Sequence, residues 1–536
     1  MAYTSLNFML FLAVVILLYY AVPKKIQWAI LLIASYAFYL FSGVKQVVFI
    51  MATTLITYAA GRLMQKKRDA FKRDLEENGA ELSRDEKREM KKVVGAKIHR
   101  IQVFAVLLCL GILAVVKYVN FATENINELF SLFHYDYQLP LINIIVPLGI
   151  SFYTFQSIGY LIDIGRGKYE AEKHLGKYAL FVSFFPSIVQ GPINRFDDLG
   201  KQLKAEHKLD YCNLKFGAQL MLWGFFKKLV IADRVAPMVD AIFSDGYKEY
   251  SGIVFVVGML AYAVQIYCDF SGGIDIARGA AQMLGINLPQ NFERPYFSET
   301  VAEYWRRWHI TLGAWMRDYV FYPVMLSKPV SKLATDMRKK GKPYLAKMAP
   351  SVITPFVVFF LIGIWHGASW QYIAFGLYNA TIVAGSVALE PVFEKMVEKL
   401  RINTGAFSWR LFRIVRTFII LGVSKLLVCA PGLRAALYML KHIFTDIPDL
   451  DFLFGVKGEI FTLGVDQKNM TILLLGVLIL LIVSILQECG IKMRETIAQQ
   501  NLYFRWFLYL AAIVVILFFG IYGPGYDAAQ FIYQAY

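Results

Sequence analysis

Two histidines in apolar surroundings are the residues of this chain best suited to do chemistry. His366 lies in "FVVFFLIGIWHGASWQYIAFGLYNA", and no charged residue occurs between Ser351 and Trp365. Gly363 and Gly367 bracket the ring, a spacing that favours close approach by another helix or by a substrate. A core histidine with satisfied hydrogen bonds is the alternative. Five further histidines lie in or beside charged or loop-like contexts: His99, His134, His174, His207 and His442.

The second histidine, His309, belongs to "EYWRRWHITLGAWMRDYVFYPV" (303–324), which we expect to form one continuous helix. Spacings of three and four predict an aromatic face made of Trp305, Trp308, Leu312, Trp315, Tyr319 and Tyr322. Arg306, His309, Gly313 and Arg317 fall together beside that face, whereas Arg307 and Asp318 fall elsewhere. Two cations beside His309 predict a neutral imidazole if the site is desolvated. Alternatively, the arginines reach lipid headgroups and the tryptophans form an interfacial belt.

A neutral histidine at membrane depth suits two tasks. It can act as a general base that activates a hydroxyl, or it can relay protons in a transporter. The chain contains no G-x-S-x-G elbow, no phosphate-binding P-loop and no H-E-x-x-H zinc helix. The five cysteines form no C-x-x-C pair, so neither a disulfide framework nor a metal site is expected.

A group of polar residues in "YCDFSGGID", namely Asp269, Ser271 and Asp275, is weak evidence for a cation site. Two carboxylates separated by glycines are more typical of a polar turn. We expect this turn to line a cavity.

The elements that must position these residues are membrane helices. The chain has 536 residues, of which 57% are hydrophobic and 18% charged, too few charges to coat a soluble protein of this size. Apolar runs predict about a dozen transmembrane or re-entrant helices, several of them short. The runs lie near 6–22, 28–43, 46–61, 101–117, 141–162, 178–190, 214–232, 252–268, 351–365, 371–390, 411–430, 469–488 and 506–523.

Charge predicts how the chain crosses the membrane. Residues 62–100 contain thirteen Lys or Arg against eight Asp or Glu, and residues 328–347 contain seven against one. The positive-inside rule makes both segments cytoplasmic loops, the first largely helical, and places the N-terminus outside the cytoplasm. The first apolar run lacks the features of a cleaved signal peptide and is expected to be retained. No aromatic residues alternate with the basic ones as in nucleic-acid sites, so the net charge of +16 does not indicate nucleic-acid binding.

No linker or repeat divides the sequence, which predicts a single membrane domain over 1–536. Between 147 and about 325 the apolar runs are interrupted by Gly, Pro and charged residues. Such backbone is tolerated at membrane depth only when it is buried in protein or lines a wet cavity. A cavity is therefore expected in this middle third, with 1–146 and 381–536 supplying flanking helices.

Together and in this order, several segments resemble the membrane-bound O-acyltransferase family, in particular its bacterial branch of alginate O-acetyltransferases and teichoic acid D-alanyl transfer proteins. The resemblance covers most of 147–380 and the C-terminus. The segments are "PLGISFYTFQSIGYLID" (147–163), "FFPSIVQGPINRF" (184–196), "YCDFSGGIDIARG" (267–279), "LGINLPQNFERPYFSETVAEYWRRWHITLGAWMRDYVFYPV" (284–324), "GIWHGASWQYIAFGLYN" (363–379) and the tail "FIYQAY".

The resemblance implies an all-α polytopic membrane protein whose helices form a funnel around a central channel in a catalytic core over 147–380. The protein would lie in the cell membrane, and its channel would join a cytoplasmic thioester of coenzyme A or of an acyl carrier to an extracytoplasmic acceptor. By family pattern His366 is catalytic and His309 is its partner in the channel, positioning the acyl group or its oxyanion. Supporting or channel positions are Trp305, Arg306, Arg317, Asp318, Asp269, Ser271, Trp365, Trp370 and Asn379. Arg317 and Asp318 are expected to hold their helix in place.

The favoured activity is O-acetylation of a surface polysaccharide, directly or through a secreted or membrane-anchored partner acyltransferase, with no bound cofactor. D-alanyl transfer from a carrier-protein phosphopantetheine to teichoic acid is the alternative, and a polysaccharide exporter or proton-coupled transporter is a remote one. The chain departs from the alginate type at "FYPVMLSKPVSKL" (321–333) and at Gly273, where the family commonly has tyrosine. Both departures put alginate itself in doubt as the acceptor.

Overall fold

The computed structural model describes residues 1–41, 43–144, 146–446 and 459–523, and this part of the chain is helical. Its single β feature is an isolated antiparallel bridge between Phe292 and Trp308. The predicted all-α class is therefore confirmed. The tail "FIYQAY", which contributed to the family resemblance, lies outside the described residues.

The chain divides into two compact units, and the first comprises Met1–Gly217 and Ala277–Pro289. Its elements are α1 (Leu6–Ala21), η1 (Lys24–Ile26), α2 (Gln27–Leu40), α3 (Val44–Glu77), α4 (Arg84–Leu132), α5 (Ile150–Arg166), α6 (Leu175–Ser183), α7 (Phe185–Ile188), α8 (Leu199–Lys204), the first half of α9 (Tyr211–Phe225) and the end of α11 (Gly252–Met283).

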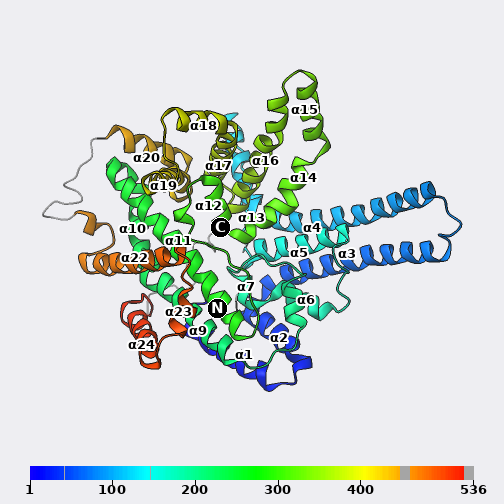
Figure 1. Cartoon of the computed structure of the whole chain (residues 1–536), viewed down its shortest axis with the longest axis horizontal. Helices are drawn as coiled ribbons and strands as arrows, with labels where there is room; N and C mark the ends of the chain where they lie inside the picture. Colours follow the sequence, from blue (N-terminus) through cyan, green and yellow to red (C-terminus); the bar gives the residue numbers. More distant parts are fainter. Residues whose placement is uncertain (42, 145, 447–458, 524–536) are drawn as a thin grey trace. The chain divides into compact units, whose positions relative to one another are not determined.

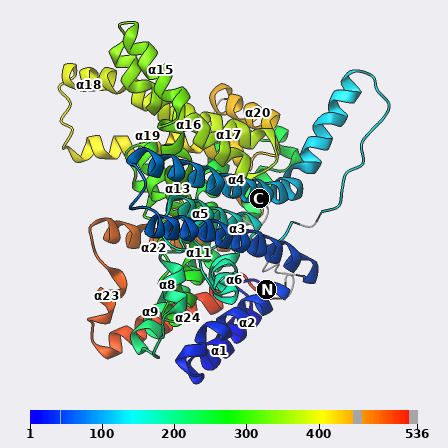
Figure 2. The same ribbon diagram turned by 90° about the vertical axis from the view of Figure 1, so that its right-hand side faces the viewer.

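Three helices, α3, α4 and α5, lie side by side in this unit, as both views show (Figures 1 and 2). The basic segment 62–100 forms the end of α3 and the start of α4, joined by a short turn. A capping box starts α4, because the Ser83 hydroxyl accepts from the Glu86 N–H and the Glu86 carboxylate accepts from the Ser83 N–H. The predicted helical character of this segment is confirmed.

The second unit comprises Ala218–Ile276 and Gln290–Tyr536. Beyond its parts of α9 and α11, its described elements are η2 (Phe226–Ala232), α10 (Asp233–Ile242), η3 (Asp245–Glu249), η4 (Pro295–Phe297), α12 (Val301–Arg307), α13 (Ile310–Met316), η5 (Arg317–Phe321), α14 (Tyr322–Met325), α15 (Lys328–Lys339), α16 (Pro343–His366), α17 (Trp370–Ala388), α18 (Glu390–Lys399), α19 (Phe407–Cys429), α20 (Leu433–Thr445), η6 (Glu459–Thr462), α22 (Gln467–Glu488), α23 (Met493–Ala498) and α24 (Leu502–Phe519).

Two of these helices, α16 and α17, pack closely because glycines replace side chains at their crossing. A Cβ on Gly363 would lie 2.4 Å from the Tyr372 carbonyl oxygen, and one on Gly376 would lie 2.4 Å from the Phe359 carbonyl oxygen. No side chain fits at either distance. The expected close approach of a second helix beside His366 is confirmed, and it fixes the end of α16 that bears this histidine.

Six described helices are long and apolar enough to cross a membrane: α3, α4, α11, α16, α22 and α24. A seventh span results if α17 and α18, bent by 57° to one another, count as one. The expected number of about a dozen is not confirmed. Several predicted runs form shorter helices, such as α2 with 14 residues and α6 with 9. The prediction of a single membrane domain and the predicted funnel stay predictions.

Candidate active site

The segment 303–324 is not one helix, contrary to the expectation from its periodicity. It forms α12, α13, the π-turns of η5 and α14. The break falls at His309, whose φ of 48° and ψ of 52° are left-handed, a conformation uncommon outside glycine. The prediction that Arg306, His309 and Arg317 share one face of a continuous helix is therefore wrong.

A preceding loop holds this break open. The Glu293 N–H donates to the Arg307 carbonyl (2.9 Å), and the Ile310 N–H donates to the Asn291 carbonyl (3.0 Å). Together with the bridge between Phe292 and Trp308, these bonds satisfy backbone groups that a helix would otherwise have paired internally. Left-handed backbone at a non-glycine residue costs about 1–3 kcal/mol and persists where surrounding bonds impose it.

The side chain of Asn291 sets the tautomer of His309. Its Oδ1 accepts from the Thr311 N–H (3.0 Å) and the Thr311 hydroxyl (2.9 Å), and lies 3.3 Å from His309 Nδ1. Because a backbone N–H can only donate, the atom facing it is the amide oxygen, and His309 Nδ1 must carry the proton. In the neutral ring the lone pair is then on Nε2.

Burial keeps that ring neutral. His309 is 3% exposed, between the rings of Phe270 (4.9 Å) and Trp365 (5.8 Å). It lies outside the candidate spans, and its burial, with a smaller contribution from the nearby charge of His366, lowers its pKa from 6.5 to about 3. The expected neutral imidazole is supported, but the cause is desolvation and His366 rather than two flanking arginines.

The other histidine, His366, ends α16 and is half-buried. Its ring lies 5.0 Å from Trp365, 5.4 Å from Phe375 and 6.3 Å from Tyr372, measured between centroids. Trp365 therefore lies beside both histidine rings. The structure brings together His309, Trp365 and His366, all of which were predicted as site residues from the sequence.

A small cavity of about 40 Å³ lies beside His366 in the second unit. Its wall is mainly aromatic and aliphatic, the composition typical of ligand pockets that place a few polar groups among apolar ones. The lining residues are Tyr262, Ile266, Tyr304, Trp305, Trp308, His366, Phe375, Leu421, Ser424, Lys425 and Val428. The buried Trp305 Nε1 has no hydrogen-bond partner among the described residues. A ligand oxygen in the cavity would satisfy such a donor.

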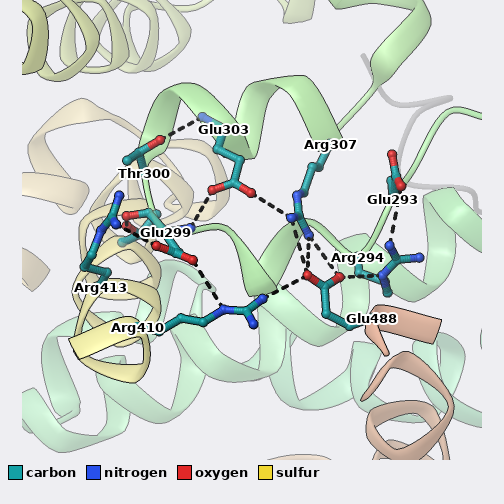
Figure 3. Close-up of polar contacts among 10 residues, drawn as sticks. Glu293, Arg294, Glu299, Thr300, Glu303, Arg307, Arg410, Arg413 and Glu488 are labelled. Atoms are coloured by element: carbon teal, nitrogen blue, oxygen red, sulfur yellow. Dashed lines mark hydrogen bonds and ion pairs between the residues drawn. The ribbon is translucent and has the colours of Figure 1, made fainter. Parts of the chain in front are cut away.

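The other side of α12 is held by ion pairs (Figure 3). Glu488 on α22 pairs with Arg294 (2.7 Å), Arg307 (3.1 Å) and Arg410 (3.2 Å). Arg307 also pairs with Glu303 one turn before it (2.7 Å), and the Thr300 hydroxyl caps this helix by accepting from the Glu303 N–H (3.1 Å). α12 thus presents aromatic rings to the cavity and is anchored through its charged side.

A second carboxylate extends this network to α19. Glu299 pairs with Arg410 (3.3 Å) and Arg413 (2.7 Å), as Figure 3 shows. Arg410 therefore connects Glu299 with Glu488. Because α19 also carries four cavity residues, the network fixes two walls of the cavity together.

Asp269 and Ser271 do not form a turn and do not line this cavity. They lie inside α11, where Lys228 pairs with Asp269 and with Asp233 (2.8 Å). The neighbouring Lys227 donates to Ser271 (2.8 Å) and pairs with Asp275. The glycines that suggested a turn serve close packing instead, because a Cβ on Gly272 would lie 2.9 Å from the Gly224 carbonyl oxygen. These buried charges link α11 to the π-helical segment η2.

Four other predicted site residues lie away from the cavity wall. Arg306 is exposed, and Trp370 is 55% exposed at the start of α17. Arg317 pairs with its neighbour Asp318 (3.0 Å), and both are solvent-accessible. This pair joins two adjacent residues of η5. Its expected role in holding the helix in place stays a prediction.

Asn379 lies behind the cavity wall. Its amide nitrogen donates to the Phe375 carbonyl and to the Ser424 hydroxyl, both at 2.8 Å. Both partners line the cavity, so Asn379 positions the wall without belonging to it.

Asn291, Ser424 and Lys425 were not predicted as site residues from the sequence. Lys425 shares the apolar run 411–430 with Arg413 and Arg416, and a cation inside such a run is a costly placement and a signal in itself. Asn291 gives no such signal, because its role depends on contacts made in the fold. Among the residues that the structure describes, no group of three or more His, Cys, Asp or Glu could hold a metal ion.

Comparison with known proteins gives one family and several relatives. The model of MBOAT, the membrane-bound O-acyltransferase family, matches residues 172–335, which include His309. A protein named probable alginate O-acetylase from Azotobacter vinelandii is 31% identical over 439 residues, 81% of this chain and 76% of its own length. A peptidoglycan O-acetyltransferase from Helicobacter pylori is 32% identical over 53% of this chain and 56% of its own. A teichoic acid D-alanyltransferase from Bacillus subtilis is 32% identical over 46% of this chain and 60% of its own.

Proposed function

Because the chain belongs to the membrane-bound O-acyltransferase family, we propose that it moves an acetyl group from a cytoplasmic thioester to an extracytoplasmic hydroxyl. The hydroxyl would belong to a cell-surface polysaccharide or to a secreted partner acyltransferase. The chain is a multi-pass membrane acyltransferase, and the proposal concerns its donor, acceptor and residues. The observation that carries it is His366 in the wall of a small aromatic cavity, with a neutral second histidine close by.

His366 is proposed as the general base. Its ring nitrogen accepts the proton of the acceptor hydroxyl while the hydroxyl oxygen attacks the thioester carbonyl. The carbon–sulfur bond then breaks, and the departing thiolate takes the proton from the imidazolium of His366. The ester product and a free thiol remain, and His366 returns to its neutral form. Its half-buried position at the end of α16 supports access by both substrates.

His309 supports this step as an acceptor. Since Asn291 holds its Nδ1–H, its Nε2 can accept a hydrogen bond from the incoming hydroxyl or from the His366 ring. The same tautomer cannot donate to an oxyanion, which argues against that part of the expectation from the family pattern. The buried Trp305 indole N–H in the cavity wall is a better placed donor to the developing oxyanion.

The donor is proposed to be acetyl-coenzyme A or an acyl-carrier thioester, and no bound cofactor is needed. The basic segments at 62–100 and 328–347 are proposed to face the cytoplasm, where they suit the phosphates of coenzyme A or an acidic carrier protein. The N-terminus would then be extracytoplasmic.

D-alanyl transfer to teichoic acid is the second candidate. It is favoured by the relative from Bacillus subtilis with that name, although the aligned part is shorter than for the alginate O-acetylase. The two activities attach different acyl groups to the surface polymer, and mild alkali releases either group.

The test is to release surface esters from intact cells with mild base and to measure acetate and D-alanine. We expect acetate from cells carrying the wild-type protein and its loss with His366→Ala. The control is His99→Ala, which changes an exposed histidine on α4 and should leave the release unchanged. Release of D-alanine in place of acetate would select the second candidate. Release of neither by wild-type cells would reject both.

A further inference from the structure

We propose that Lys425 makes the cavity beside His366 selective for a small uncharged acyl group, so that it takes acetyl and rejects aminoacyl groups such as D-alanyl. This inference rests on the proposed acyl transfer at His366. It assigns to Lys425 a role in specificity.

Lys425 is buried in an aromatic cage. It belongs to α19, is 7% exposed and lines the cavity together with His366. Its Nζ lies 4.9 Å from the ring centroid of Tyr296, 5.3 Å from that of Tyr304 and 5.9 Å from that of Phe418. These distances are within the range of cation–π attraction. Within the described part of the chain no carboxylate forms an ion pair with Lys425.

The cavity size fits the acyl part of the donor. A space of about 10–15 Å³ holds one water, so a cavity of about 40 Å³ has room for roughly three non-hydrogen atoms. An acetyl group has that number. Because the other lining side chains are mostly aromatic or aliphatic, its methyl group would meet apolar surface.

An aminoacyl group meets two obstacles at Lys425. Its ammonium would share the cavity with the ammonium of Lys425, and at a separation of roughly 5 Å the repulsion between the two cations corresponds to discrimination on the order of 100-fold. The aromatic cage that could attract an ammonium is already occupied by Nζ of Lys425. Replacing Lys425 by an uncharged side chain removes the repulsion and vacates the cage.

The experiment compares propionyl and glycyl donors. The two acyl groups have equal numbers of non-hydrogen atoms, but propionyl ends in a methyl group and glycyl in an ammonium group. Permeabilised cells receive radiolabelled acetyl-, propionyl-, glycyl- or D-alanyl-coenzyme A, and the alkali-labile label on the surface polymer is counted. The wild-type protein should transfer propionyl about 100-fold faster than glycyl. Lys425→Met should lower this ratio at least tenfold, and Lys425→Arg, which keeps the charge, should retain it.

A wild-type protein that transfers acetyl but does not distinguish propionyl from glycyl overturns this inference and leaves the proposed function intact. This outcome is measured on the wild-type protein alone, so it does not depend on whether a variant folds. An unchanged ratio in both Lys425→Met and Lys425→Gln also overturns it. If the wild-type protein transfers D-alanyl and not acetyl, the inference and the proposed acetyl transfer both fail.

Discussion

At the scale of the residue, the site depends on what surrounds each imidazole. His309 is enclosed by Phe270, Trp365 and the amide of Asn291, so it is held as one neutral tautomer. His366 lies at a helix end and in the wall of a cavity, where a substrate can reach it. The two rings have Trp365 as a common neighbour, and they differ in that His309 is buried and His366 is half-buried.

Acid should destabilise the fold through His309. Its pKa is lowered from 6.5 to about 3 in the fold, so between these values the unfolded chain binds a proton that the folded protein does not. The stability from keeping His309 neutral is complete above pH 6.5 and is lost as the pH falls, by about 1.4 kcal/mol per pH unit.

The check is the thermal unfolding midpoint in detergent at pH 7.5 and pH 5, for the wild-type protein and for His309→Asn. Asparagine tolerates left-handed backbone, so it is a suitable replacement. The midpoint of the wild-type protein should fall more on acidification than that of the variant. Equal falls would mean that His309 does not titrate in this way.

At the scale of the element, helix crossings and helix breaks place these residues. Gly363 and Gly376 let α16 and α17 approach so closely that His366 and its aromatic neighbours are fixed together. The break between α12 and α13 positions His309, and the ion pairs around Glu488 hold α12 in place (Figure 3).

Gly363→Ala should separate α16 from α17. The added methyl group would lie 2.4 Å from the Tyr372 carbonyl oxygen, and such overpacking costs typically 1–3 kcal/mol. The control is Gly385→Ala on α17, where nothing lies within 4 Å and the helix should gain up to about 1 kcal/mol. We expect a lower unfolding midpoint and lost transfer activity for the first variant only. Equal midpoints for both variants would contradict the close crossing.

The sequence predicts local features of these elements but not their long-range contacts. The pattern of Gly363, His366 and Gly367 correctly indicated a close helix approach, because small residues at a crossing are a local signal. The periodicity of 303–324 predicted a continuous helix wrongly, since aromatic spacing persists across a break that depends on pairing with residues 291–293. The glycines near Asp269 indicated a turn, although they serve the packing of α11.

At the scale of the whole molecule, the chain is a helical membrane protein with six or seven candidate spans in its described part. Its basic residues are concentrated at the junction of α3 and α4 and in α15, which precedes α16. The positive-inside rule predicts that both regions face the cytoplasm, the side on which the proposed thioester donor would be available.

This topology can be measured with single cysteines. In a variant lacking the five native cysteines, Asn78→Cys and Gly341→Cys should react with a membrane-impermeant thiol reagent only after the membrane is permeabilised. Both positions lie in turns at the ends of basic helices. Labelling of either residue in intact cells would reverse the predicted orientation.

The most direct test of the role of His366 is the rate of acetyl transfer by purified protein from acetyl-coenzyme A to surface polymer isolated from cells that lack the protein. Removing a general base typically lowers a rate by about 10²–10⁴-fold. We predict a loss of that size in kcat for His366→Ala, with an unfolding midpoint close to that of the wild-type protein. A folded His366→Ala protein that keeps its rate within tenfold of the wild type would contradict general-base catalysis by this residue.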